Sequence, residues 1–504
     1  MRWTRACETA KVNLLAAHTH GVPLQTPGEK ARKQMRSRSH IGSAVVFVSF
    51  LLTSFGRAQE PASTGAAPPT NNANGSLVCR SQTNTTQPCL ADQTDAGKNP
   101  NEPVLLAQAT ASAAAPQDAA AQPATAPAAS PDPPAALPTP SITGPLLGLP
   151  PAVFDAGPFG KIAVNGILDG LGMWTGNYVA GDNSTQAALS NGQVFIQKAD
   201  GWFQFYLQAG AYNIAALGAP FLATDKTMTK LFGPVPVAFA KLQPGKNSPF
   251  KNTSLLIGAL PTLIGAEYTF TFENMNIHRG LLWNQENAVN RGIQVNQAMG
   301  KFTASLSWND GFYSNRYSWL TGSLTYTKGP HSLVFVGGGN YGQTAFQTYA
   351  TPVQNNSSIY NVIYTYTKGH WILQPYFQYT NVPTNQKIGI VKGASTTGGA
   401  MLASYTFKHG FSLPVRWEYI SSSGNATDQA ANLMYGPGSA ATSITVTPTF
   451  QRGGFFIRGD LAYVHASDIT PGDAFSRNGM NQNQPRAMAE FGFIFGNNVV
   501  EKKP

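Results

Sequence analysis

Short turns built around a basic residue recur through the second half of the chain. The clearest four contain Lys328, Lys368, Lys408 and Arg452, which are 40, 40 and 44 residues apart. Three further turns, at 198–201, 244–246 and 299–301, fit the series more loosely. Tight turns that recur between apolar and aromatic segments are typical of antiparallel β-hairpins. The second half of the chain is therefore predicted to be a series of hairpins.

The segments beside these turns alternate between apolar and polar residues. After the third turn, the odd-numbered positions from Phe411 to Tyr419 are apolar or aromatic, and Ser412, Arg416 and Glu418 lie between them. This alternation predicts strands with one apolar and one polar face. A β-sandwich would show the same pattern, but it needs a hydrophobic partner layer, and strands of about 10 residues recur here without one. Aromatic residues beside every turn favour the interfacial girdle of a transmembrane barrel.

Longer connections rich in Asn, Ser, Gly and Thr separate the short turns. Eight long connections and seven short turns join 16 strands. Outer-membrane barrels keep their short turns in the periplasm, and an even strand count places both ends there. The sequence therefore predicts an all-β fold, a transmembrane antiparallel up-and-down β-barrel over 151–504. The long connections are expected at 175–191, 213–234, 261–287, 309–317, 342–357, 381–397, 421–441 and 466–485.

Composition argues against the competing classes of protein. Only 12% of the residues are charged, against about 25% in ordinary globular domains. Outside one short run near the N-terminus, no stretch approaches the ~18 uncharged apolar residues of a spanning helix. The net charge of +10 falls to +3 without the first 58 residues, which hold nine Lys or Arg and two Glu. Charge therefore gives no support for a nucleic-acid partner.

The N-terminal region has the pattern of an export signal. Arg36, Arg38 and His40 precede an apolar run over 41–55, and small residues flank Arg57. We predict a signal peptide over 35–58, with Met35 as the true start and 1–34 as an upstream extension outside the natural protein. An unusually long basic region before the apolar run is the alternative.

Residues 59–150 form a low-complexity segment rich in Ala and Pro. Such a segment cannot bury enough apolar area to offset its ordering entropy, so we predict a disordered or polyproline-like periplasmic extension. It would act as a spacer or bind an envelope partner. Cys79 and Cys89 fit a disulfide loop in an oxidising periplasm. A metal site is a weaker interpretation because two thiolates fall short of four ligands.

Four short motifs in the middle of the chain resemble one family. They lie at 260–267 (LPTLIGAE), 279–283 (RGLLW), 291–294 (RGIQ) and 308–311 (WNDG). Together they resemble the OmpL-like β-barrel porin family, closely over about 255–312 and in architecture over about 155–495. The resemblance implies an outer-membrane porin for passive diffusion of small hydrophilic solutes or ions.

The last predicted strand, over 489–495, carries Phe491, Phe493 and Phe495 on one face. This resembles the aromatic terminal signal by which barrel-assembly machinery recognises its clients, except that nine residues follow Phe495. The expected partners are therefore this machinery, outer-membrane lipid, and the solutes or ions that pass. A homotrimer is compatible with a wide porin, although no interface is identifiable in the sequence.

If the apolar faces contact lipid, the opposite faces line the lumen. A barrel of about 16 strands is too wide for wall side chains alone to fill, so water or an infolded loop must occupy it. Wall charges of both signs would order water and favour small hydrophilic solutes. The alternative is that these charges are paired and have no selective role. The predicted pore-lining residues are Gln204, Gln208, Arg291, Arg416, Glu418, Arg458, Asp460 and Glu490.

The connection over 261–287 is the longest and is unusually apolar for an exposed loop, above all at 268–273 and 281–283. We predict that it folds inward and narrows the pore, with Glu267, Glu273 and Arg279 near the constriction. A surface loop packed on its neighbours, or extra strand length at the rim, are the alternatives.

Two other functions have weaker support. A closed or plugged barrel that anchors the periplasmic extension is the stronger of them. A lipid hydrolase would keep a Ser/His pair on its outer face, where the alternation places His465 and Ser467, but no third orienting group is identifiable in the sequence. We therefore predict no enzyme activity. No phosphate-binding glycine motif, metal cluster or nucleotide fold is present in the sequence, and no cofactor is predicted.

Overall fold

A computed structural model describes residues 145–342 and 352–496 of the chain. The predictions for 1–34, for the signal peptide over 35–58 and for the pair Cys79 and Cys89 fall outside this part, as does nearly all of the extension over 59–150. Within the described ranges, no helix has both the length and the apolar character needed to cross a membrane.

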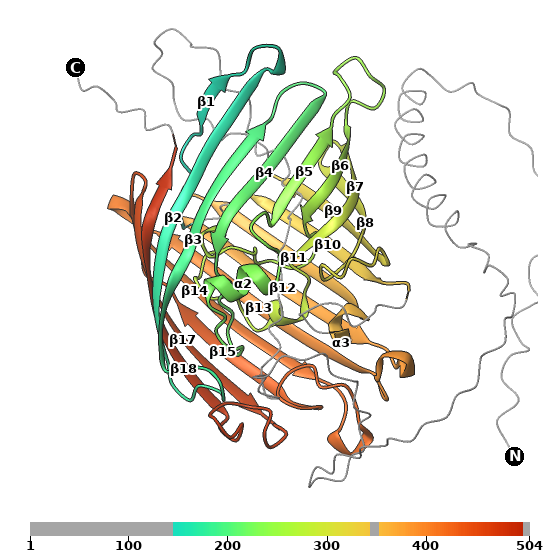
Figure 1. Cartoon of the computed structure of the whole chain (residues 1–504), viewed down its shortest axis with the longest axis vertical. Coiled ribbons are helices and arrows are strands. Elements are labelled where there is room, and N and C mark those ends of the chain that lie inside the picture. Colours follow the sequence, from blue (N-terminus) through green and yellow to red (C-terminus); the bar gives the residue numbers. More distant parts are fainter. Residues whose placement is uncertain (1–144, 343–351, 497–504) are drawn as a thin grey trace, which may run out of the picture. The chain divides into compact units, whose positions relative to one another are not determined.

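Antiparallel strands form a single closed sheet (Figure 1). Strands that follow one another in the chain pair with each other, and the ring closes because the last strand pairs with β2. In Figure 1 the red end of the chain accordingly lies beside teal β2. The strands are β1 (Ala152–Asp155), β2 (Lys161–Thr175), β3 (Thr185–Lys198), β4 (Phe203–Tyr212), β5 (Val237–Leu242), β6 (Thr253–Pro261), β7 (Val289–Met299), β8 (Phe302–Asn309), β9 (Trp319–Lys328), β10 (His331–Asn340), β11 (Ser358–Lys368), β12 (Trp371–Val382), β13 (Ala394–Thr406), β14 (Phe411–Ser422), β15 (Ala440–Val446), β16 (Thr449–Arg452), β17 (Phe455–Ser467) and β18 (Asn483–Phe495).

The barrel wall has 16 strands because β15 and β16 form one strand, and because β1 is a short strand that pairs antiparallel with the first four residues of β2. Both β15 and β16 pair with β14 on one side and β17 on the other. The break between them contains Pro448, which has no N–H for the ladder. The Pro448 carbonyl still accepts from the Gly459 amide at 2.9 Å, so the strand keeps its place. The predicted barrel and its strand count are confirmed.

The short turns and the long connections lie at opposite ends of the barrel, because the strands run alternately up and down. Gly329, Gly369 and Gly453 each follow the basic residue of a turn and have φ of 57°, 60° and 60°. Glycine adopts this left-handed conformation without steric cost, which explains the glycine that recurs after the basic residue. Two long connections carry the short helices α2 (Thr224–Lys230) and α3 (Pro352–Asn355).

The predicted long connections agree with the observed ones to within four residues at each end, apart from the first. That connection ends earlier than predicted, because residues 185–191 belong to β3. The observed connections are 176–184, 213–236, 262–288, 310–318, 341–357, 383–393, 423–439 and 468–482.

The two faces of the wall differ in character. Along β17, Leu461 is 60% exposed and Tyr463 44%, whereas Arg458 and Asp460 between the outward positions are completely buried. An apolar outer band around a closed barrel is the lipid-contacting surface of a transmembrane barrel. Every second residue therefore faces inward. Outward apolar residues that recur around the wall include Leu168, Val194, Ile257, Ile293, Leu324, Phe335, Val362, Phe377, Trp417, Ile444, Leu461 and Phe491.

Candidate functional site

The connection between β6 and β7, residues 262–288, lies inside the barrel, and we call it the inward loop. Every residue of the inward loop except Asn284 is buried. Its only regular structure is two short 3-10 helices, Thr271–Glu273 and Leu282–Gln285. A buried loop with so little regular structure leaves backbone N–H and C=O groups that need partners from elsewhere. Charged side chains on the inner wall supply many of these partners.

Arg416 and Glu418 of β14 bind separate parts of the inward loop. Arg416 forms an ion pair with Glu267 of the inward loop and donates to the His278 carbonyl oxygen at 2.7 Å. The Glu418 carboxylate accepts hydrogen bonds from the backbone amides of Leu281 at 3.0 Å and Leu282 at 3.3 Å. One wall strand therefore binds both an acidic side chain and the main chain of the inward loop.

Asp460 of β17 binds the inward loop at a second point. Its carboxylate accepts from the backbone amides of Ile277 at 2.8 Å and His278 at 3.2 Å. The His278 ring nitrogen Nδ1 lies 3.2 Å from the other carboxylate oxygen. Burial lowers the pKa of His278, although the nearby carboxylate opposes this shift. A neutral imidazole that donates from Nδ1 fits this contact.

Arg458, also on β17, bridges the wall and the first half of the inward loop. Its guanidinium donates to Glu490 of β18 at 2.9 Å and to the backbone carbonyls of Thr271 and Asn274, each at 3.0 Å. Glu490 also accepts from the Ser190 hydroxyl at 2.6 Å, and that hydroxyl lies 2.8 Å from the Thr271 hydroxyl. Glu490 therefore reaches the inward loop through its neighbours rather than directly.

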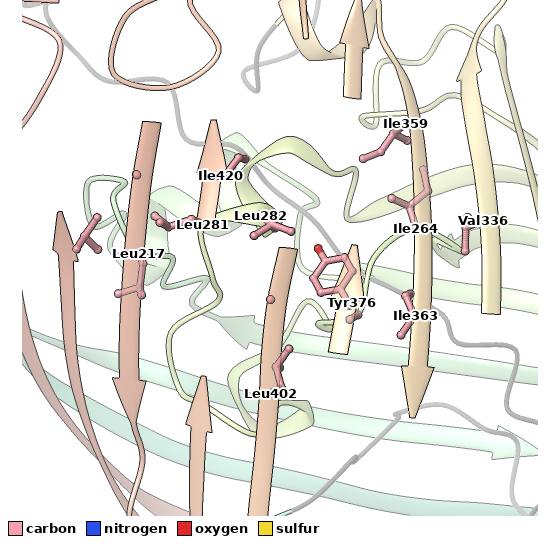
Figure 2. Close-up of a cluster of buried hydrophobic side chains, with 14 of the residues drawn as sticks. Leu217, Ile264, Leu281, Leu282, Val336, Ile359, Ile363, Tyr376, Leu402 and Ile420 are labelled. Atoms are coloured by element: carbon pink, nitrogen blue, oxygen red, sulfur yellow. The ribbon is translucent and has the colours of Figure 1, made fainter. Parts of the chain in front are cut away.

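Apolar side chains of the inward loop pack against a wide part of the wall. Figure 2 shows Leu282 beside Tyr376 of β12, and Ile264 near Ile359 and Ile363 of β11. All five belong to one buried cluster that also includes wall residues of β10 and β13. The inward loop is thus held by charged contacts and by apolar packing, and β14 and β17 contribute to both.

Aromatic residues fill the space toward β3 and β4. Phe272 of the inward loop lies 5.7 Å from Phe195 of β3, measured between ring centroids, and Phe270 lies 5.1 Å from Tyr212 of β4 in an edge-to-face arrangement. Offset and edge-to-face aromatic pairs stabilise a packed core beyond their buried area. These contacts explain the apolar residues that make 268–273 unusual for a loop.

A second connection, 213–236, supports the inward loop. The Arg279 amide donates to the Ala215 carbonyl, and the Leu217 amide donates to the Arg279 carbonyl, each at 2.9 Å. Arg486 of β18 donates to the carbonyl of Ala216 at 2.7 Å. The second connection is therefore bound both to the wall and to the inward loop.

The remaining constriction candidates are also buried. The Glu273 carboxylate accepts from the Phe270 amide at 3.1 Å, within the first 3-10 turn of the inward loop. The Arg279 guanidinium donates to the Ile277 carbonyl at 3.2 Å and lies 5.4 Å from the centre of the Trp283 ring. The structure thus brings Glu267, Glu273 and Arg279 into the barrel interior on one loop.

Three other predicted pore-lining residues do not contact the inward loop in this way. Gln204 and Gln208 face inward on β4. Gln204 donates to the Gly201 carbonyl at 3.0 Å, and Gln208 donates to Gln193 at 2.6 Å. Arg291 differs from the prediction: the alternation of β7 gives it the outward side, with Ile293 and Val295.

Arg291 lies where β7 leaves the inward loop, and its local partners explain its direction. Its guanidinium is paired with Asp310 at 2.8 Å and lies 3.9 Å from the centre of the Tyr313 ring. Both partners belong to the neighbouring connection, 310–318. The inward positions of this strand are instead occupied by Gly292 and Gln294.

Several buried polar residues of the site were not predicted from sequence. Glu286 of the inward loop accepts a hydrogen bond from the Tyr376 hydroxyl, and burial raises the pKa of its carboxyl. Asp169 of β2 accepts two hydrogen bonds from the Asn191 amide, each 3.0 Å long. Strand alternation could have found the inward position of Asp169, but Glu286 lies on a loop, and their partners are 22 and 90 residues away in the chain.

Within the two described ranges, no group of three or more His, Cys, Asp or Glu is arranged to hold a metal ion. The arrangement consists of ion pairs and hydrogen bonds that fix a loop inside a barrel.

Comparison with known proteins gives one family and several similar structures. Residues 161–495 match the family model described as "Putative beta-barrel porin-2, OmpL-like". No protein of curated function matches the chain.

Three solved structures are similar to this chain at low sequence identity. The anion-selective porin from Comamonas acidovorans is 15% identical, with 66% of this chain and 99% of that chain covered and a TM-score of 0.44. In-vitro folded OmpT, an outer membrane protein of Vibrio cholerae, is 12% identical, with 67% and 98% covered and a TM-score of 0.45. Salmonella typhi OmpF in complex with daunomycin is 13% identical, with 66% and 98% covered and a TM-score of 0.44.

Proposed function

We propose that this chain, which belongs to the OmpL-like family of β-barrel porins, lets small hydrophilic solutes or ions diffuse passively across the outer membrane. The observation that carries the proposal is the inward loop, a buried segment fixed by wall charges inside a closed barrel of 16 strands. A barrel of this size needs such a filling to restrict passage, because its wall side chains do not meet across the lumen.

In this proposal the inward loop sets the width of the pore. Arg416, Glu418 and Asp460 act as its attachment points, because each of them binds the loop directly. Wall charges that are paired with the loop are not free to interact with passing ions. Solute preference would then depend on the space that the loop leaves and on the remaining polar side chains of the wall.

A closed barrel is the second candidate, and one observation favours it. Wall charges bind the main chain of the inward loop, and apolar contacts complete the packing. A lumen filled in this way could be sealed, and the barrel would then anchor the periplasmic extension. No catalytic step is part of either proposal for the lumen.

The proposed partners follow from the location of the barrel. Outer-membrane lipid would cover the apolar outer band, and barrel-assembly machinery would insert the chain. A homotrimer remains a proposal. The signal peptide would direct export and the extension over 59–150 would lie in the periplasm.

Single-channel conductance of the purified chain in a planar bilayer tests these proposals. A pore gives stepwise openings, whereas a folded barrel that stays silent refutes the open pore and favours the anchor. Deletion of 268–278, which lies within the inward loop, should raise the conductance of each opening. Deletion of 424–429, an exposed segment of the connection between β14 and β15, is the control. An unchanged conductance after the first deletion would refute the role of the inward loop.

A further inference from the structure

A cluster of polar side chains lies on the outer face of the barrel, away from the lumen. At the long-connection end of β17, His465 and Ser467 share the outward side with Tyr463. Residues two apart on a strand lie about 6.8 Å apart along it and point the same way, so the imidazole and the hydroxyl are neighbours on one face. Asn483, the first residue of β18, is directly opposite His465 in the ladder. The sequence did not indicate that Asn483 belongs to this group, because residues 468–482 separate it from Ser467 in the chain.

Asn483 orients the histidine ring. The His465 ring nitrogen Nδ1 lies 2.8 Å from the Asn483 side-chain oxygen Oδ1. The Tyr463 hydroxyl donates to the same oxygen at 2.7 Å, which identifies it as an acceptor. The neutral tautomer that fits this contact donates from Nδ1 and leaves Nε2 as an acceptor, the nitrogen that a general base uses.

Asn483 is itself held in place from two directions. Its backbone amide donates to the Asn481 side chain at 2.9 Å, and its carbonyl accepts from the Asn177 side chain at 2.8 Å. In an acyl-transfer triad, a third group fixes the tautomer and the direction of a histidine that lies beside a nucleophilic hydroxyl. Asparagine can take the place of aspartate as this third group.

The position of the group suits a substrate in the membrane interface. Leu461 and Tyr463, the outward residues that precede His465 on β17, are exposed. Tyr419, in the same row of the sheet as His465, is exposed as well. Aromatic side chains of this kind mark the boundary between hydrocarbon and polar headgroups, which is the depth of a lipid's ester bonds.

We propose that His465, Ser467 and Asn483 form a hydrolytic site for carboxylic esters of membrane lipids. The Ser467 Oγ attacks the ester carbonyl carbon and its proton passes to His465 Nε2. The carbon–oxygen bond to the alcohol then breaks, and the alcohol leaves with that proton. Water, deprotonated by the same nitrogen, attacks the acyl-serine and releases the fatty acid, which restores the hydroxyl of Ser467.

The chain bends sharply just after the nucleophile. Asp468 has φ of 52° and lies beyond the end of β17, so its backbone amide follows Ser467 outside the strand. An amide directly after a nucleophilic serine is a common donor to the negatively charged oxygen of the intermediate. We assign the Asp468 amide this role in the site.

The test uses the full chain, purified as a folded barrel in detergent and mixed with vesicles of phosphatidylethanolamine and phosphatidylglycerol. Release of fatty acid is measured, and a fluorophosphonate probe shows whether a serine is reactive. The expected result is hydrolysis by the wild type, with the probe on Ser467 by peptide mass spectrometry. Ser467→Ala should abolish both signals, and His465→Gln should lower hydrolysis by about 10² to 10⁴.

Ser421 provides a matched control. It lies on the same outer face as Ser467 and in the same row, two strands away, but Tyr419 takes the place of the histidine. Ser421→Ala should therefore leave hydrolysis unchanged. Asn483→Ala should lower hydrolysis and shift its pH profile, because the imidazole would lose its preferred tautomer, whereas a purely structural role would leave the profile in place.

Two results would overturn the proposal. One is a folded wild type that releases no fatty acid and leaves Ser467 unlabelled. The other is hydrolysis that persists in Ser467→Ala, which would trace the activity to a contaminant. Folding of each variant is checked by the change in gel mobility on heating. Because the site faces lipid and the pore faces the lumen, failure here would leave the conductance result untouched.

Discussion

Replacing Glu418 by glutamine should loosen the inward loop. The carboxylate accepts from the Leu281 and Leu282 amides and from the Ser443 hydroxyl, and it lies 3.2 Å from the Arg416 guanidinium. Hydrogen bonds to a charged group contribute roughly 1.5–3 kcal/mol each, against about 1 kcal/mol between neutral groups. Glutamine keeps one acceptor oxygen and turns an amide donor toward one of the two loop amides.

The expected loss in docking free energy follows from these contacts. One charged contact becomes neutral and the other is lost, which amounts to about 3 kcal/mol. An equilibrium shifts tenfold for every 1.4 kcal/mol, so the undocked fraction should rise roughly 100-fold. In single-channel recordings at fixed voltage, Glu418→Gln should spend a correspondingly larger part of its time in a level of higher conductance.

Two variants make this prediction specific. Gln204→Ala removes an inward amide that bonds to a short turn and not to the inward loop, so its recordings should match the wild type. Asn276 and Thr447 are joined by a side-chain hydrogen bond of 2.7 Å, and cysteines at both positions should tie the loop to the wall. Oxidation of this pair in the Glu418→Gln background should remove the added openings. If Glu418→Gln and Gln204→Ala give the same recordings, wall charges do not hold the loop.

Two further substitutions test the packing and the membrane-facing surface. In Gly280→Ala the new Cβ would lie 2.0 Å from a Glu418 oxygen, and the free energy of unfolding in urea should fall by about 1–3 kcal/mol. Gly172→Ala is the control, because no atom lies within 4 Å of its new Cβ. An equal change in the two variants would contradict the predicted clash. Leu461→Arg, in the middle of outward-facing β17, should cost about 2–4 kcal/mol, and Phe411→Arg, at the first residue of β14, about 0–1 kcal/mol. Tryptophan fluorescence during unfolding measures both, and equal costs would refute a lipid-facing middle band.

The sequence by itself determined the barrel, because its signals are local. Side chains alternate with a period of two along any strand, and glycine recurs at the tight turns. These rules act over a few residues, so the strand count, the turn positions and the inward direction of Arg416, Glu418, Arg458 and Asp460 could all be predicted. The apolar residues of 261–287 likewise indicated a loop that avoids water. Arg291 was the exception: strict alternation with Ile293 and Val295 gives it the outward side, and its prediction as a pore-lining residue departed from that alternation.

Only the tertiary structure decided what the inward side chains contact. Glu418 binds amides 137 and 136 residues away, and Asp460 binds an amide 183 residues away. Closure of the sheet brings such groups together, and no local rule relates their positions in the chain. The same holds on the outer face, where His465 meets Asn483 only because β17 and β18 pair in one register. Local backbone geometry determines the direction of each side chain, and the tertiary structure determines which residue it contacts.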